Sequence, residues 1–287
     1  MNDLRCYQQL PIWHHDTLPE GFKKQHNTKE NTWAKLNILN GNLDFAMLSE
    51  QGEILSEHQF SVEHQPPFIA PQAWHKIVST SDDIECQLSF YCEPQFYFTK
   101  KYQLTATHSE ILAAAPSIPV GKALDVGCGT GRNSLYLNQL GFEVDAFDVN
   151  PMSIQKLNDI IQAEKLTNIH TEIRDLNADQ QITGNYDFIF STVVMMFLQP
   201  ETIPALIQNM QNATRSGGFN LIVCAMDTED YPVLPNFPFS FKPNELREYY
   251  QDWEILKYNE NVGELHRKDE QGNRIKQRFA TLWAKKP

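Results

Sequence analysis

The sequence predicts an α/β domain with a mostly parallel sheet, preceded by a small all-β domain. Up to about residue 93, short segments of alternating apolar and polar residues recur between turns, which is the pattern of half-buried strands. After that point, apolar strands alternate with helical segments, an order typical of a parallel sheet with helices on both faces. We therefore expect a β-sandwich or barrel over residues 1–93 and the α/β domain over residues 94–287.

In the first domain, strands are clearest over residues 33–39 and 84–90, which alternate at period two. Turn residues at 41–42 (Gly-Asn) and 51–52 (Gln-Gly) separate such strands. No convincing amphipathic helix interrupts them, which favours a small sandwich or barrel.

The second domain begins with an apolar strand that ends at Asp125 and leads through glycines into a helix. The elements predicted from there on are, in order, helix 133–140, strand 144–147, helix 154–163, strand 169–173, strand 186–194, helix 203–213, strand 219–225 and strands 254–267 and 274–284. The last two strands flank the polar turn 268–273, so we expect them to form a closing antiparallel hairpin.

Composition argues against several classes of function. The 24 basic and 36 acidic side chains give a net charge of -12, which disfavours nucleic-acid binding. No apolar run is long enough for a transmembrane helix, and the N-terminus lacks the pattern of a secretory signal. The five cysteines are scattered, so neither a zinc site nor a disulfide framework is expected. We expect a cytoplasmic protein without membrane insertion, and the sequence leaves a homo-oligomer open.

A glycine-rich turn follows the first strand of the α/β domain, where open sheets bind ligands. Its glycines are Gly127, Gly129 and Gly131. A dinucleotide fingerprint requires a further glycine at position 132, where this chain has Arg132. Asp125, at the strand end, would repel a pyrophosphate but suits the ammonium group of a methionine moiety. The turn therefore favours a methyltransferase over a dehydrogenase.

Acidic residues also follow the second and third strands. Asp148 is placed to accept hydrogen bonds from both ribose hydroxyls, although a helix cap is the alternative, for which Asn150 is better suited. Asp175, with Leu176 beside it, is placed for an adenine amino group, and a plain loop aspartate is the alternative. The end of the fourth strand is expected beneath the methionine portion and comprises Ser191, Thr192 and Val193.

This series of a glycine turn and two acids resembles the class I S-adenosylmethionine-dependent methyltransferases, which have a Rossmann-like fold. The resemblance implies S-adenosyl-L-methionine as the cofactor and a seven-stranded sheet whose last strand is antiparallel. It also implies that Arg132 or Tyr102 holds the cofactor carboxylate, although a packing role would explain either residue equally well. The remaining residues expected around the cofactor are Asn133, Val149, Asn150 and Met152.

Charged residues on the C-terminal hairpin are the candidates for substrate binding. His266, Arg267 and Arg274 would form an anion site if they cluster across the turn, because guanidinium groups match oxyanion geometry. Charges on a hairpin are, however, more often a solvated face. The proline- and phenylalanine-rich segment 231–243 is either a roof over a pocket or an aromatic loop packed on its own domain.

Three segments of the chain narrow the resemblance to one family. Residues 127–137, residues 191–198, and residues 263–267 together with 272–276 resemble the tellurite-resistance methyltransferases of the TehB family, whose longer members carry an N-terminal β domain. The family implies methylation of tellurite, and of selenium oxyanions such as selenite, with His266, Arg267 and Arg274 at the active site as catalytic residues. Two other functions stay open: a methyltransferase for an organic metabolite or thiol, and a cofactor-binding sensing module with weak transfer.

Residues 71–77 resemble a stretch of the cupin-like barrels, which often bind a metal through histidines. His26 and His75 are therefore candidate ligands. The His-x-His pair and glutamate of such metal sites are missing, so packed histidines and no metal are expected.

Overall fold

The computed structural model describes residues 3–287, apart from the side chains of His266 and Arg267. The chain divides into two compact units, Met1–Leu104 and Thr105–Pro287. No helix among the described residues is long and apolar enough to span a membrane.

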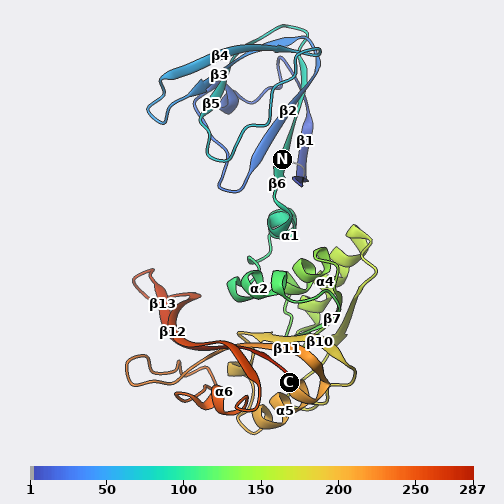
Figure 1. The fold of residues 1–287 in the computed structure, drawn as a ribbon. Helices are drawn as coiled ribbons and strands as arrows, with labels where there is room; N and C mark the ends of the chain where they lie inside the picture. The colour runs from blue at the N-terminus through green and yellow to red at the C-terminus, as the bar shows by residue number, and fades with distance from the viewer. Residues whose placement is uncertain (1–2) are drawn as a thin grey trace. The chain divides into compact units, whose positions relative to one another are not determined.

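The first unit consists of two three-stranded antiparallel sheets that face each other (Figure 1), with the strand orders β1-β6-β2 and β4-β3-β5. The strands are β1 (Arg5–His14), β2 (Trp33–Asn40), β3 (Asn42–Leu48), β4 (Ile54–Ser61), β5 (His75–Thr80) and β6 (Glu85–Cys92). The predicted strands over 33–39 and 84–90 are thus β2 and β6. Gly41 and Gly52 have φ angles of +73° and +87° at the two predicted turns.

The last strand of this unit ends at Cys92, but the unit itself continues to Leu104. A 3-10 turn, η2 (Pro94–Phe96), leads into the short helix α1 (Tyr97–Tyr102), and another such turn, η1 (Glu20–Lys23), follows β1. The Lys100 ammonium donates to the Thr32 hydroxyl at 2.7 Å, and the Arg5 guanidinium lies 5.8 Å from the Tyr97 ring centroid. These contacts attach α1 to the sheets before it.

The second unit contains a seven-stranded sheet in the order β12-β13-β11-β10-β7-β8-β9, in which β13 is antiparallel to both neighbours and all other pairs are parallel. Its strands are β7 (Lys122–Val126), β8 (Glu143–Asp148), β9 (Ile169–Ile173), β10 (Tyr186–Thr192), β11 (Thr214–Ala225), β12 (Glu254–Lys268) and β13 (Arg274–Lys285). The predicted α/β fold with a closing antiparallel hairpin is confirmed. β11 begins five residues earlier than predicted, and β10 ends two residues earlier.

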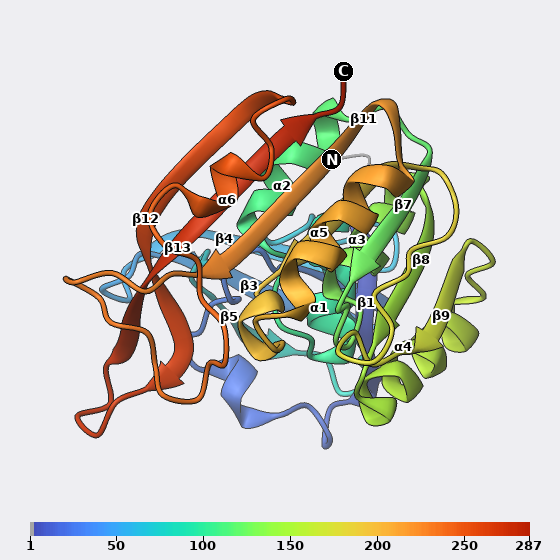
Figure 2. The ribbon, with the colours of Figure 1, turned by 90° about the horizontal axis from the view of Figure 1, so that it is seen from below.

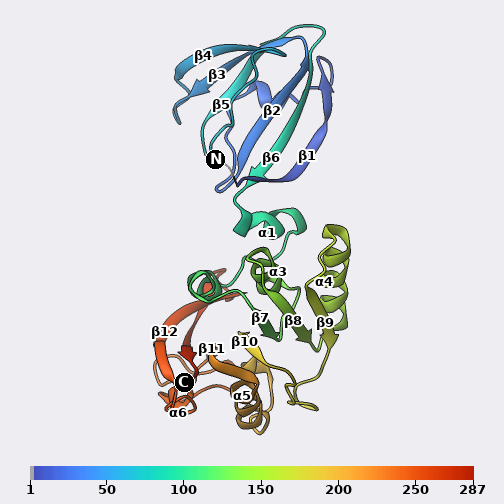
Figure 3. The ribbon, with the colours of Figure 1, turned by 45° about the vertical axis from the view of Figure 1, so that its right-hand side comes forward.

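Helices cover both faces of this sheet, with α3 and α4 on one side and α5 and α6 on the other (Figures 2 and 3). The helices and 3-10 turns are α2 (Ser109–Ala114), η3 (Ala115–Ser117), α3 (Arg132–Gln139), α4 (Pro151–Glu164), η4 (Met195–Phe197), α5 (Thr202–Ala213) and α6 (Glu245–Glu248). From β7 the chain continues to β8 on one side, and later returns to β10 on the other. The turn after β7 therefore lies where the strand order reverses, which is where open α/β sheets bind ligands.

Candidate active site

A cavity of about 570 Å³ lies at the carboxyl ends of the parallel strands of the second unit. Ten of the residues expected from the sequence to surround a cofactor line it: Gly127, Gly129, Arg132, Asn133, Asp148, Val149, Asp175, Leu176, Thr192 and Val193. These residues come from four separate segments of the chain, and the parallel sheet brings them to one edge.

The glycine turn adopts a backbone that requires glycine. Gly127, Gly129 and Gly131 have φ angles of +80°, +54° and +82°. A Cβ atom on Gly127 would lie 2.5 Å from the Val194 side chain, and one on Gly131 would lie 2.4 Å from Leu157. A Cβ on Gly129 would meet no protein atom within 4 Å. The middle glycine therefore leaves open space on the side of the cavity that a ligand can approach.

Asp148 is held at the cavity by two backbone donors. Its Oδ2 accepts from the Gly129 N–H at 2.8 Å and its Oδ1 accepts from the Asn150 N–H at 2.9 Å. Asn150 caps α4, since its side-chain oxygen accepts from the Met152 N–H at 2.9 Å. The cap thus belongs to Asn150, and Asp148 keeps its remaining acceptor capacity toward the cavity.

Asp125 lies behind the glycine turn and does not line the cavity. It is 1% exposed, and its Oδ2 accepts from the Ser134 hydroxyl at 2.6 Å. Its Oδ1 is buried without a partner among the described residues. Burial raises the pKa of this carboxyl to about 7, although the Ser134 hydroxyl and the Arg132 guanidinium oppose the shift. A buried, unpaired carboxylate oxygen fits a neighbouring cationic group such as a cofactor ammonium.

The raised pKa of Asp125 predicts how stability depends on pH. Above its ordinary pKa of 3.8 the unfolded chain loses a proton that the folded chain retains up to about pH 7. The native protein should therefore lose stability relative to Asp125→Asn as pH rises from 4 to 7, by at most about 4 kcal/mol, and level off above pH 7. Urea unfolding of both proteins without cofactor, from pH 4.5 to 8.5, measures this difference. A difference that stays constant with pH would contradict the prediction.

Asn133 joins three segments around the cavity. It is 2% exposed, its amide donates to the Thr192 hydroxyl at 3.0 Å, and its oxygen accepts from the His108 N–H at 3.0 Å. Ser191 is fully buried and donates to the Val126 carbonyl at 3.2 Å, so it supports the sheet and does not line the cavity.

Val193 ends the fourth strand in a strained conformation. Its φ angle is +63°, which is unfavourable for a β-branched residue. This turn is why β10 stops at Thr192, two residues before the predicted end. Such outliers cluster at functional sites, and Val193 lines the cavity.

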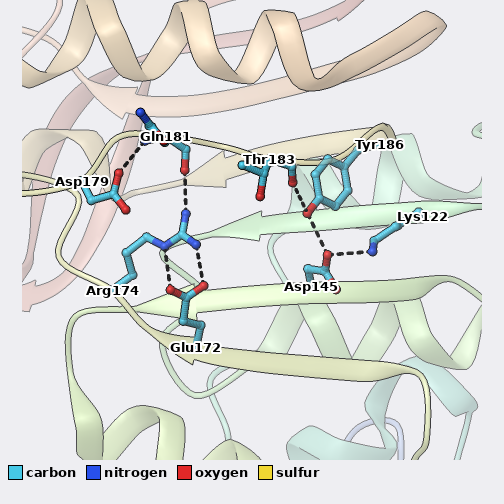
Figure 4. Close-up of polar contacts among 8 residues, drawn as sticks. All are labelled: Lys122, Asp145, Glu172, Arg174, Asp179, Gln181, Thr183 and Tyr186. Carbon is cyan, nitrogen blue, oxygen red and sulfur yellow. Dashed lines mark hydrogen bonds and ion pairs between the residues drawn. The ribbon is translucent and has the colours of Figure 1, made fainter.

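Arg174 fixes the loop that carries Asp175 and Leu176 (Figure 4). Its guanidinium binds both oxygens of Glu172, at 3.0 and 2.5 Å, and donates to the Gln181 carbonyl at 2.7 Å. It also lies 4.8 Å from the ring centroid of Phe147. Asp175 Oδ1 accepts from the N–H of residue 177 at 2.9 Å, while its other oxygen makes no hydrogen bond to the described residues.

A second polar group in Figure 4 lies on the neighbouring strands. The Tyr186 hydroxyl donates to Asp145 at 2.7 Å, and the Lys122 ammonium lies 2.9 Å from the same oxygen. Asp145, Glu143 and His170 have the side chains to ligate a metal ion. Lys122 also lies 3.1 Å from Glu143, so its ammonium already occupies the place of a cation between the two carboxylates.

A further cavity of about 470 Å³ adjoins the first, because Arg132 and Val193 line both. Its polar lining includes His108 and the ion pair of Lys257 with Glu110, at 2.6 Å. Its other lining residues belong mainly to the last two strands and include Asn259, Asn261, Val262, Gly263, Glu264, Leu265, Phe279 and Thr281. The pair of cavities thus offers one site for a cofactor and an adjacent site for an acceptor.

Arg274 does not line either cavity. It is exposed and lines a separate hollow on the hairpin, which shares Glu264 with the acceptor cavity. The side chains of His266 and Arg267 lie outside the described residues. Tyr102 ends α1 in the first unit, whereas both cavities are formed by the second, so its role stays a prediction.

Five of the cofactor residues predicted within the second unit do not line the cavity, and several lining residues were not predicted. The former are Asp125, Gly131, Asn150, Met152 and Ser191, of which Met152 is 80% exposed. The latter are Thr105, Cys128, Thr130, Phe147, Arg174, Asn177, Val194, Phe197 and Leu198. All of these lie within five residues of a predicted one. All except Thr105 also lie on or shortly after a strand of the sheet, so proximity to a strand end is the signal that would have found them.

Comparisons with known proteins agree along the whole chain. Residues 90–283 match the family described as "Tellurite resistance protein TehB", and residues 8–88 match the "TehB-like domain". A Haemophilus influenzae protein named "Probable S-adenosyl-L-methionine-dependent methyltransferase TehB" is 53% identical over 285 residues, 99% of each chain. Hemagglutinin 1 of Eikenella corrodens is 45% identical over 84% of this chain and 79% of its own. The crystal structure of TehB from Haemophilus influenzae superposes with a TM-score of 0.94 at 52% identity, covering 100% of this chain and 99% of that one.

Proposed function

Because this chain belongs to the TehB family and is an S-adenosylmethionine-dependent methyltransferase, we propose that it methylates tellurite and, as related substrates, selenium oxyanions such as selenite. The observation that carries this proposal is the acceptor cavity beside the glycine-turn cavity, with Arg132 and Val193 lining both. A nucleophile in the second cavity would meet a methyl group presented from the first.

The residues around the first cavity fit the parts of the cofactor. Asp148 would bind the ribose hydroxyls, and Asp175 with Leu176 would bind the adenine. Asp125 would attract the ammonium from behind the glycine turn and Arg132 would pair with the carboxylate, while the space beside Gly129 admits the ligand close to the backbone. S-adenosylmethionine supplies a methyl group on a positively charged sulfur, which departs as a neutral thioether when a nucleophile takes the methyl.

Tellurite is a suitable nucleophile because its tellurium atom carries a lone pair. The substrate is already anionic, so the protein needs to hold it within about 3 to 3.5 Å of the methyl carbon and to exclude water, more than to remove a proton. Arg267 and Arg274 are proposed to bind the oxygens, with His266 orienting or protonating one of them. Leu265, which directly precedes His266, lines the acceptor cavity, and this supports an active-site position for the hairpin.

Replacing Arg267 or Arg274 with alanine should lower tellurite methylation at least tenfold and leave cofactor affinity nearly unchanged, since a charge-assisted hydrogen bond is worth about 1.5 to 3 kcal/mol. Volatile or extracted methyl-tellurium product is measured against time, and cofactor affinity by calorimetry. Arg247→Ala, which removes an exposed cation on α6, is the control. If both hairpin variants methylated tellurite at the native rate, the proposed role of Arg267 and Arg274 in binding the oxyanion would be wrong.

A second candidate is methyl transfer to an organic metabolite or thiol. The acceptor cavity favours it in one respect, because about 470 Å³ exceeds the space that a small oxyanion needs, and Val262, Leu265 and Phe279 give it apolar walls. Comparing transfer to tellurite, selenite and a panel of thiols at equal concentration separates the two functions. A thiol with a much higher kcat/KM than tellurite would make the organic acceptor the substrate. Cofactor binding without transfer to any of them would indicate a sensing module.

A further inference from the structure

The first unit contains a cavity of its own, of about 350 Å³, which lies between its two sheets. This volume falls in the range of small-molecule sites. Its walls are mainly apolar and aromatic and include Trp13, Phe22, Leu36, Phe45, Ile77 and Phe90. Nothing in the proposed methyl transfer uses this cavity.

Two histidines lie side by side among the polar residues of this cavity, which also include Tyr7, Gln8, Asn27, Thr28, Lys29 and Thr32. The backbones of His26 and His75 exchange hydrogen bonds at 3.1 and 2.9 Å, and their ring centroids are 4.2 Å apart. Aromatic rings support both from the sides: Phe22 is 5.1 Å from His26, and Phe45 is stacked on His75 at 5.4 Å. The backbone pairing and the ring contacts fix the positions of the two imidazoles.

The hydrogen bonds of these rings determine their tautomers. Nδ1 of His75 lies 2.8 Å from the Ala73 carbonyl, and Nδ1 of His26 lies 2.9 Å from the Lys24 carbonyl. A carbonyl only accepts, so each Nδ1 carries the hydrogen and, in a neutral ring, each Nε2 carries a lone pair. Burial lowers the pKa of His75 to about 4, which keeps that ring neutral.

The Nε2 atom of His75 is an acceptor without a partner among the described residues. The residue is 6% exposed, and no described residue donates to its Nε2. His75 lines the cavity, so this lone pair is available to a donor group on a molecule bound there. Of the cavity's other polar groups, the Thr28 hydroxyl is already satisfied, since it donates to the Ala70 carbonyl at 3.1 Å and accepts from the Gln72 N–H at 3.2 Å.

A metal ion fits this pair less well. Structural and catalytic metal sites take three or more protein ligands. Among the residues described in the first unit, no third histidine, cysteine or carboxylate joins His26 and His75 to complete such a group. The apolar walls also suit a molecule with carbon surface more than a hydrated ion.

We propose that this cavity is a second binding site, which takes a flat apolar molecule carrying an N–H or O–H group that donates to Nε2 of His75 or of His26. The aromatic walls bury the body of the ligand, and the two imidazoles select for its donor. The site is separate from the cofactor and acceptor cavities and does not depend on the identity of the methyl acceptor.

Indole and indene provide a matched pair of probes, because they have nearly the same shape and only indole has an N–H donor. We expect the full-length protein to bind indole about five- to tenfold more tightly than indene, as the value of one hydrogen bond requires. Equilibrium dialysis measures both affinities. Equal affinities, or no binding of either probe, would overturn the proposal.

His75→Asn and His26→Asn test the two acceptors, because asparagine retains an N–H donor near the position of Nδ1 and lacks Nε2. The variant that removes the acceptor of the indole N–H should lose the preference for indole, and preserved preference in both variants would overturn the proposal. His14→Asn, at an exposed position on β1 outside the cavity, should keep the preference. Loss of the preference in the control as well would overturn the assignment to these histidines. Stoichiometric zinc binding that disappears in His75→Asn would assign a metal site instead. Since the two probes are first compared on the native protein, a variant that fails to fold leaves that test intact.

Discussion

Asp148→Ala is expected to weaken S-adenosylmethionine binding by at least about 100-fold. The variant loses two proposed charge-assisted hydrogen bonds to the ribose hydroxyls, each worth about 1.5 to 3 kcal/mol. It also frees the Gly129 and Asn150 N–H groups, which the carboxylate now holds at 2.8 and 2.9 Å, so the glycine turn loses its anchor. Isothermal titration calorimetry with the cofactor measures the change.

Two further variants identify the cause of that loss. Asp148→Asn keeps one oxygen and should fall between the native protein and the alanine variant. Glu143→Ala removes an exposed carboxylate from the other end of β8 and should bind the cofactor as the native protein does. A native dissociation constant in Asp148→Ala would show that the carboxylate does not contact the cofactor.

Sequence reasoning predicted the α/β fold because its signals are local. Apolar runs of strand length, the glycines after Asp125 and the cap at Asn150 each act within a few residues of their position. The parallel sheet then forces the strand ends together, which is why Asp148 and Asp175 line one cavity although they are 27 residues apart in the printed sequence.

The acceptor cavity could not be predicted in this way. His108, Glu110 and Lys257 come together only through the packing of α2 on the distant strand β12, and no spacing in the sequence signals that contact. For Asp125, the sequence predicts the position in the fold but not the surroundings of the side chain. The sequence indicates its place at a strand end, but whether the carboxylate lies in the cavity or behind its wall depends on side-chain packing, which buries it against Ser134.

The positive φ angle of Val193 could not be predicted from the sequence either. A β-branched residue that follows a buried strand is expected to extend it, so the sequence predicts a strand that reaches residue 194. The hydrogen bond from the Val193 N–H to the Val223 carbonyl, at 2.7 Å, holds the residue at its positive φ. Long-range contacts of this kind override local propensity.

Gly129→Ala and Gly131→Ala are expected to have different effects: the first weakens cofactor binding and the second mainly lowers stability. At Gly131 the new methyl group would lie 2.4 Å from Leu157, in addition to a φ of +82°, so stability should fall by about 2 to 4 kcal/mol. At Gly129 the methyl group meets no protein atom, and the φ of +54° costs only about 1 to 2 kcal/mol. The methyl group of Ala at position 129 would instead occupy part of the proposed cofactor site and reduce the affinity for S-adenosylmethionine at least about tenfold.

Urea unfolding and cofactor titration of both variants separate the two effects. Gly21→Ala is the matched control, since its Cβ would meet nothing within 4 Å and its φ is not positive. Gly129→Ala should bind the cofactor weakly and lose only about 1 to 2 kcal/mol of stability relative to the control, whereas Gly131→Ala should lose about 2 to 4 kcal/mol. If Gly129→Ala bound the cofactor with native affinity, the open space beside this glycine would not be where the ligand approaches the backbone, and the placement of S-adenosylmethionine along the turn would have to be revised.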